Sequence, residues 1–177
     1  MRWKNIGVAS IAGLALFIGA ASGGSDSSSS GGSSSGGSGS SSSDAVGIGK
    51  PAADGKFTFT LNSVQCGIPS VGDTANGLGA TAQGQFCKAN ITVANTGTEA
   101  QDFSSSSQYA FDASGKKFSD STEADIYANS SQNILNGINP GNSVTTDIYY
   151  DIPTGSSIAK FEFHDSPFSG GVTVNNK

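Results

Sequence analysis

The chain has 177 residues, of which 13% are charged and 35% are hydrophobic, and its formal net charge is −5. An acidic surface repels phosphate backbones and anionic lipids, so this charge argues against a protein that binds along nucleic acid. The low charge and the 25 glycines are typical of a small extracellular β protein rather than of a charged helical one.

Residues 1–21 have the three-part layout of a secretory signal peptide. Arg2 and Lys4 supply a positive start, residues 6–21 are uncharged and largely apolar, and small residues end the segment. The alternative is a membrane anchor that is kept, although the apolar run falls short of the roughly 20 residues that span a bilayer. We therefore predict a protein that is secreted or held at the extracellular face of the cell envelope, with membrane attachment only through an uncleaved segment.

Residues 22–43 contain only serine and glycine, apart from Asp26. Such a segment has no apolar surface to bury, so we predict a disordered linker with a root-mean-square span of roughly 25 Å. It is either a spacer that holds the domain away from a membrane or wall, or a passive tail. Residues 44–177 remain as the folding part, which is long enough for one stable domain.

The domain of residues 44–177 shows the period-two alternation of β-strands. Phe57, Phe59 and Leu61 share one face, and the alternation then changes parity, which predicts a β-bulge near Asn62 and Ser63. Other segments place their apolar residues on one face, namely Cys87, Ala89, Ile91 and Val93 in residues 85–95, Val144, Ile148, Tyr150 and Ile152 in residues 143–152, Phe161 with Phe163, and Val172 with Val174.

Turn residues separate these strands. Asp112-Ala-Ser-Gly115 predicts a hairpin between residues 109–111 and 117–118, and further turns fall at 95–97, 139–141 and 153–155. Residues 121–138 fit either a short helix or a loop. Short strands with turns at this spacing predict an all-β, antiparallel β-sandwich.

Cys66 and Cys87 are the two cysteines of the chain. An exported protein meets an oxidising environment, where two cysteines allow a single intramolecular disulfide. Both lie in phase with apolar neighbours, so we predict an inward-facing or edge-facing disulfide that closes a glycine-rich loop, worth roughly 3 kcal/mol in the loop-entropy model. A metal site or a redox pair is the weaker alternative, because two cysteines rarely hold a metal alone and the spacing is not that of a redox motif.

The domain also carries a series of short motifs, namely Gly49-Lys-Pro51, Phe57-Thr-Phe59, Gly84-Gln-Phe-Cys87, Val93-Ala-Asn-Thr-Gly97, Gln108-Tyr109, Asp112-Ala-Ser-Gly115, Asn139-Pro-Gly141, Asp151-Ile-Pro153 and His164-Asp-Ser166. In this order, over residues 46–174, they resemble the secreted actinobacterial family known as domain of unknown function 4352. The resemblance implies an immunoglobulin-like sandwich similar to the mycobacterial immunoprotective extracellular antigens. It implies no agreed activity, and it assigns no catalytic residues.

Three groups of residues invite a chemical interpretation. His164, Asp165 and Ser166 are adjacent, but neighbouring strand residues point to opposite faces, so they do not form a catalytic triad, and we interpret His164 as a surface or strand-end histidine. A single histidine and a paired cystine leave zinc without ligands. Residues 77–82 faintly resemble a dinucleotide loop but lack the surrounding βαβ unit, so no cofactor is predicted.

Asp120, Glu123 and Asp125 form an acidic cluster, and Asp112 is a further candidate neighbour in space. Calcium requires six to eight oxygen ligands in a defined loop, and this spacing matches no EF-hand. A solvated acidic loop is therefore the preferred interpretation, with a calcium site as the alternative.

The leading functional hypothesis is a non-catalytic module that binds an extracellular protein or another component of the cell envelope. A passive structural or antigenic envelope protein is the second hypothesis. The third is an enzyme, a hydrolase or nuclease that uses Asp and Glu side chains with a recruited divalent metal, and it would require three or more carboxylates in one cleft.

Overall fold

The computed structural model describes residues 45–129 and 137–177. The predicted signal segment and linker, residues 1–21 and 22–43, lie outside the described residues. The elements follow in the order β1 (Pro51–Asp54), β2 (Phe57–Asp73), η1 (Thr74–Asn76), β3 (Leu78–Asn95), η2 (Ser105–Ser107), β4 (Tyr109–Phe111), β5 (Lys117–Ser119), α1 (Thr122–Ala128), β6 (Ser143–Ile152), β7 (Lys160–Phe163) and β8 (Val172–Asn175).

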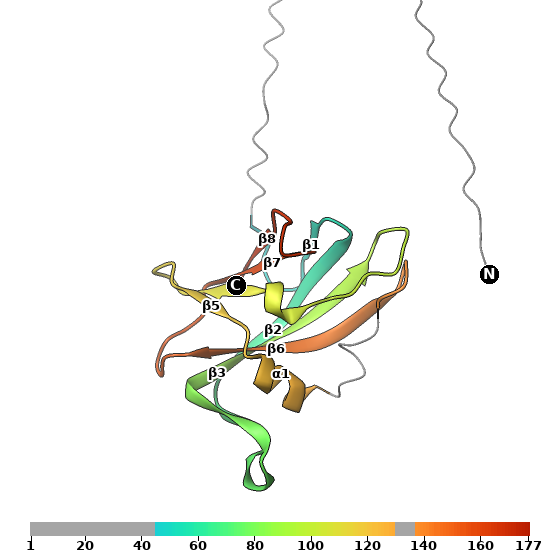
Figure 1. Ribbon diagram of the computed structural model, residues 1–177. Coiled ribbons are helices and arrows are strands. Elements are labelled where there is room, and N and C mark those ends of the chain that lie inside the picture. Colours follow the sequence, from blue (N-terminus) through green and yellow to red (C-terminus); the bar gives the residue numbers. More distant parts are fainter. Residues whose placement is uncertain (1–44, 130–136) are drawn as a thin grey trace, which may run out of the picture. The chain divides into compact units, whose positions relative to one another are not determined.

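The strands form two four-stranded sheets that pack face to face (Figure 1). The first sheet has the order β1-β2-β3-β6 and the second has the order β5-β4-β7-β8. Every pairing between these strands is antiparallel. The prediction of an all-β, antiparallel sandwich with one disulfide is therefore confirmed.

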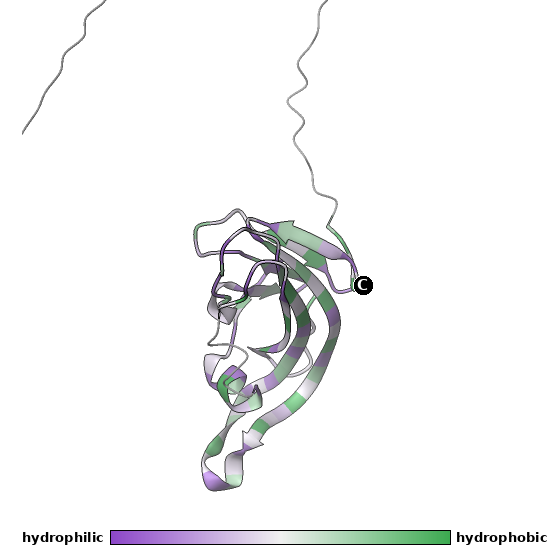
Figure 2. Cartoon of the chain, turned by 90° about the vertical axis from the view of Figure 1, so that its right-hand side faces the viewer, coloured by the Kyte–Doolittle hydropathy of each residue, from purple (hydrophilic) through white to green (hydrophobic). Residues whose placement is uncertain are grey.

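The core lies between the two sheets and contains the side chains that the alternation predicts to face inward. Hydrophobic and hydrophilic residues alternate along the strands of the first sheet (Figure 2). The second sheet contributes Phe161 and Phe163, and the ring of Phe163 stacks on Phe59 at a centroid distance of 5.4 Å. The fully buried large side chains include Phe57, Phe59, Leu61, Ile91, Val93, Ile148, Tyr150, Ile152, Phe161 and Phe163.

The predicted β-bulge lies where the change of parity places it. Leu61 pairs with Ile91, and the next pair is Ser63 with Asn90, so Asn62 has no backbone partner on β3. Its side-chain amide instead donates to Asn90 Oδ1 at 2.9 Å and to Thr92 Oγ1 at 3.0 Å. The extra residue thus turns the strand while its side chain keeps a cross-strand connection.

The β4–β5 hairpin is also as predicted. Asp112 Oδ1 accepts hydrogen bonds from the hydroxyl and the backbone N–H of Ser114 at 2.7 and 2.8 Å, and from the Lys116 N–H at 2.9 Å. These bonds, of which that from the Ser114 side chain is the largest contributor, lower the pKa of Asp112. Gly115 has a φ of 85°, which is the left-handed conformation that this turn requires.

In the stretch that fits either a helix or a loop, residues 122–128 form helix α1, and residues 130–136 lie outside the described residues. Its N-cap is Ser121, whose hydroxyl accepts the Ala124 N–H at 3.4 Å. Ala124 packs on the outer face of the first sheet, in a second cluster with Val71, Ala80, Phe86 and Tyr149. Within the described ranges, no helix has the length and apolar character that crossing a bilayer requires.

Candidate binding surface

Cys66 and Cys87 form the disulfide that the sequence predicts. Cys87 is fully buried and Cys66 is exposed, so the bridge runs from the core to the surface across adjacent strands. The prediction of a glycine-rich loop between them is wrong, because β2 and β3 continue beyond the disulfide as a paired hairpin.

This hairpin, residues 68–83, is called the arm below. Its strands stay paired up to Asp73 and Leu78, and the 3-10 turn η1 closes its tip. The arm forms because Val71 and Ala80 face each other across the strands and are covered by α1, which gives a glycine-rich sequence an apolar face to bury. Strand β6 ends opposite Gln85, so the arm extends past it (Figure 1).

Three large apolar side chains are exposed on the arm and on the helix that covers it. Leu78, Ile126 and Tyr127 are 61%, 57% and 37% exposed, and we call them the apolar patch. The tip of the arm and α1 lie against each other at Gly72, where an added Cβ would come within 3.0 Å of Tyr127 Cβ and 2.5 Å of the Leu78 carbonyl oxygen. The patch therefore joins two elements that are distant in sequence.

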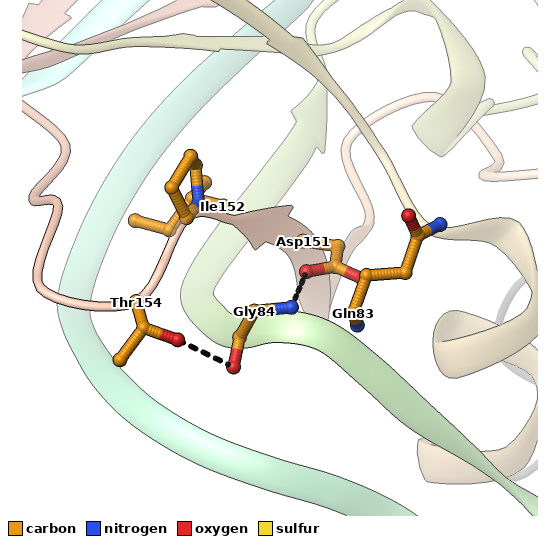
Figure 3. Close-up of a pocket in the computed structure, with 6 residues that line it drawn as sticks. Gln83, Gly84, Asp151, Ile152 and Thr154 are labelled. Carbon is orange, nitrogen blue, oxygen red and sulfur yellow. Dashed lines mark hydrogen bonds between the residues drawn. The ribbon is translucent and has the colours of Figure 1, made fainter.

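A cleft of about 420 Å³ lies at the base of the arm (Figure 3). The carboxylate of Asp151 closes it, since it accepts the Gln83 N–H at 2.6 Å and the Gly84 N–H at 3.1 Å. Thr154 Oγ1 donates to the Gly84 carbonyl at 3.2 Å. Internal hydrogen bonds therefore already engage these polar groups. The same bonds join the base of the arm to the end of β6 and to Thr154, and they fix the direction of the arm. Its lining residues are Gln83, Gly84, Asp151, Ile152, Pro153 and Thr154.

His164 follows β7 directly, as expected for a strand-end histidine, and its imidazole contacts residues other than Asp165 and Ser166. Its Nε2 lies 2.8 Å from Glu162 Oε1, and its Nδ1 lies 3.3 Å from the Ser169 carbonyl and 3.4 Å from Ser169 Oγ. The Ser169 hydroxyl donates to the Ser166 carbonyl at 3.0 Å, so its proton points away from the imidazole. This geometry ties a loop together and does not activate a nucleophile.

Two members of the predicted acidic cluster, Asp120 and Asp125, lie near each other, but its three carboxylates do not gather around one point. Asp120 Oδ2 accepts hydrogen bonds from Ser105 Oγ at 3.3 Å and Thr122 Oγ1 at 3.0 Å, whereas Glu123 is exposed and Asp125 is buried. In residues 45–129 and 137–177, no three His, Cys, Asp or Glu side chains gather around a common point. The calcium alternative gains no support from this arrangement.

Asp125 is the most perturbed carboxyl group of the described chain. Its Oδ1 accepts the Tyr149 N–H at 2.7 Å, while its Oδ2 has no hydrogen-bond partner among the described residues. Burial raises its pKa to about 7, and the nearby Asp120 and Asp147 carboxylates add to this rise.

Asp125 belongs to a set of groups that cover the outer edge of β6. The Ser121 N–H donates to the Tyr149 carbonyl at 2.6 Å, next to the bond from the Tyr149 N–H to Asp125. The side-chain amide of Asn129 donates to the Asp147 carbonyl at 2.8 Å and accepts the Asp147 N–H at 3.3 Å. The ends of α1 thus satisfy edge groups that another strand would otherwise pair with.

The family model of domain of unknown function DUF4352 matches residues 46–174, inside the predicted domain of residues 44–177. A comparison with curated proteins finds no match.

Three solved structures share the fold. MPT63, described as a secreted protein from Mycobacterium tuberculosis, is 14% identical with a TM-score of 0.52 over 76% of this chain and 99% of that chain. The yjhA protein from Bacillus subtilis is 16% identical with a TM-score of 0.53 over 75% and 99%. A conserved hypothetical protein from Bacillus anthracis is 14% identical with a TM-score of 0.50 over 72% and 94%. At these identities the likeness establishes a common β-sandwich fold.

Sequence reasoning missed the arm and its apolar patch. Tyr149 was a usable signal, because an aromatic residue on the outward parity of a strand indicates that something covers that face. Leu78 was a second signal, since it is a large apolar residue in a glycine-rich segment. Neither residue indicates which element would provide the cover.

Proposed function

We propose that this chain, which belongs to the DUF4352 family of unknown function, is an exported module that binds a protein component of the cell envelope through its arm. The export part of the proposal rests on the signal-like residues 1–21 and on the description of its structural neighbour MPT63 as secreted. The binding part rests on the apolar patch.

A single exposed apolar side chain on a protein surface has no special meaning. Here Leu78 is exposed on the projecting arm, and Ile126 and Tyr127 are exposed on the helix that covers it, which places them within reach of a partner. Complete burial of a leucine-sized side chain contributes about 1.5–3 kcal/mol. The patch can therefore supply several kcal/mol to an association, and the disulfide at the root of the arm limits the entropy that binding would cost.

Site-specific photocrosslinking in the cells that export the protein tests this proposal. A photoreactive phenylalanine derivative replaces Leu78 or Tyr127 in the full chain, and the matched control carries it at Thr173, on the outer face of the second sheet. We expect a protein adduct from the two arm positions and none from Thr173. Purified wild-type protein should compete with adduct formation, and the Leu78→Asp variant should compete at least tenfold less well, a loss of about 1.4 kcal/mol.

Adducts that no purified competitor suppresses, or that form equally at Thr173, would refute binding through the arm. They would favour a passive structural or antigenic envelope protein, which predicts no saturable contact.

Export has its own test. Trp3 is the single tryptophan of the chain, so removal of residues 1–21 should leave a mature protein without tryptophan fluorescence. Persistent tryptophan emission from envelope-bound protein would indicate that the segment is kept as an anchor.

A further inference from the structure

The outer edge of β3 is open along the arm. Strand β6 pairs with β3 from Gln85 to Ala94, and the Asp151 carboxylate takes the N–H groups of Gln83 and Gly84. Along residues 78–82, no backbone hydrogen bond reaches this edge from any other segment of the described chain. An open edge of this kind is a template for pairing with another strand.

Parts of three other strand edges are protected. The exposed edge of β2 contains three register shifts between residues 61 and 70, and Pro69 removes one donor. The edge of β6 is covered by side chains around α1. The edge of β8 is covered by the segment that precedes β1, through a bridge between Val46 and Val174.

The open stretch of β3 has none of these protective features. Residues 78–82 contain no proline and no charge, and their pairing with β2 is regular from Leu78 opposite Asp73 to Thr81 opposite Ser70. Proteins ordinarily protect an exposed strand with such devices. Their absence from this stretch, in a molecule that uses them on other strands, indicates an edge that is available for a partner.

Charge indicates which partner fits. Asp73 lies at the tip of the arm, Glu123 lies on the covering helix, and Asp151 lies at the base, whereas Lys88, farther along β3, is paired with Asp147 at 3.5 Å. Four of the seven lysines in the described ranges instead lie in or beside the second sheet, at positions 116, 117, 160 and 177. The acidic surroundings of the arm attract a basic segment and repel the arm of a second copy.

We propose that the outer edge of β3 between Leu78 and Ala82 binds an extended, lysine- or arginine-rich polypeptide segment by strand addition. This inference rests on the proposed function and specifies how the arm binds. The main chain of the segment supplies affinity through hydrogen bonds to the open edge. Leu78 shares a face with Ala80, which α1 covers, so every second side chain of the segment lies on the face that carries the apolar patch.

The test uses peptides selected from a random dodecapeptide display library against the immobilised full-length protein. We expect the selected peptides to alternate apolar and basic residues and to lose at least tenfold in affinity when their basic residues are changed to glutamate. Methylation of alternate backbone amides in the peptide should also cost about tenfold, as expected for the loss of edge hydrogen bonds. In the protein, bound peptide should slow hydrogen exchange of alternate amides within residues 78–82.

The outcomes separate this inference from the proposed function. If the peptides lose binding on Leu78→Ser but tolerate methylation and leave exchange of residues 78–82 unchanged, the arm binds without strand addition and the inference fails. If Leu78→Ser has no effect on peptide binding, or no peptide is selected, the inference fails, and crosslinking at Leu78 and Tyr127 still decides the proposed function. Slowed exchange of residues 78–82 in the free protein, together with a dimer mass by light scattering, would show that a second copy occupies the edge and would overturn the basic-segment proposal.

Discussion

Replacement of Asp125 by asparagine should remove a pH dependence of stability that this single carboxyl group imposes. The asparagine side chain would keep an oxygen that accepts the Tyr149 N–H, and it would be neutral at every pH. The folded-state pKa of Asp125 is about 7, against an ordinary value of 3.8. Between these two values the folded protein holds a proton that the unfolded chain has released, so stability falls as pH rises through this window.

The magnitude follows from the difference between the two pKa values, which is about 3 units. At 1.36 kcal/mol per unit, the full contribution is about 4 kcal/mol, and the part lost between pH 5 and pH 8 is about 2.5 kcal/mol. We therefore expect the stability advantage of the Asp125→Asn variant over the wild type to grow by about 2.5 kcal/mol between pH 5 and pH 8.

Urea unfolding of both proteins at intervals from pH 5 to pH 8 measures this difference. Glu123→Gln is the matched control, because it removes the same charge from an exposed position on the same helix and should leave the difference from wild type constant with pH. If the wild type and Asp125→Asn gave parallel curves over this range, the carboxyl group would already be ionised in the folded protein and the reasoning from burial would be refuted.

Three further predictions concern stability. Phe59→Ala should lower the free energy of unfolding by about 3–5 kcal/mol, because the ring is fully buried against other aromatic rings, and a loss below about 1 kcal/mol in urea titration would contradict this. Asn129→Ala should cost about 1–3 kcal/mol and speed hydrogen exchange of the Asp147 amide, whereas unchanged exchange would show that the edge needs no side-chain cover. Replacement of both Cys66 and Cys87 by alanine should cost roughly 3 kcal/mol, and equal denaturation midpoints with and without the disulfide would refute the prediction.

The sandwich could be predicted because strand alternation reports directly on burial. Phe57, Phe59 and Leu61 follow period two until the bulge, and the change of parity located the bulge itself. The pairing of Cys66 with Cys87 followed from their number alone. These features depend on local patterns, which a sequence displays openly.

The candidate site depends on contacts between distant segments, and these have no local pattern. The arm is rich in glycine, and it is held in strand form by burial of Val71 and Ala80 beneath Ala124, about 50 residues away in sequence. Strand β1 was missed for a related reason, since Pro51 and Gly55 bound a run too short to show an alternation. The Asp125 carboxyl was placed in a solvated cluster because its burial arises only when α1 meets the edge of β6.

The bridge between Val46 and Val174 has a consequence for how the domain is held. It fixes the first described residues beside the last strand, at the end of the sandwich away from the tip of the arm (Figure 1). A linker attached at Ala45 would therefore hold the domain at the end opposite the tip of the arm. The arm would stay accessible to a partner. Tension on that linker would act first on the hydrogen bonds that join residues 46 and 48 to residues 175 and 177. A pulling force could therefore separate these terminal segments while the base of the arm, which the disulfide crosslinks, stays intact.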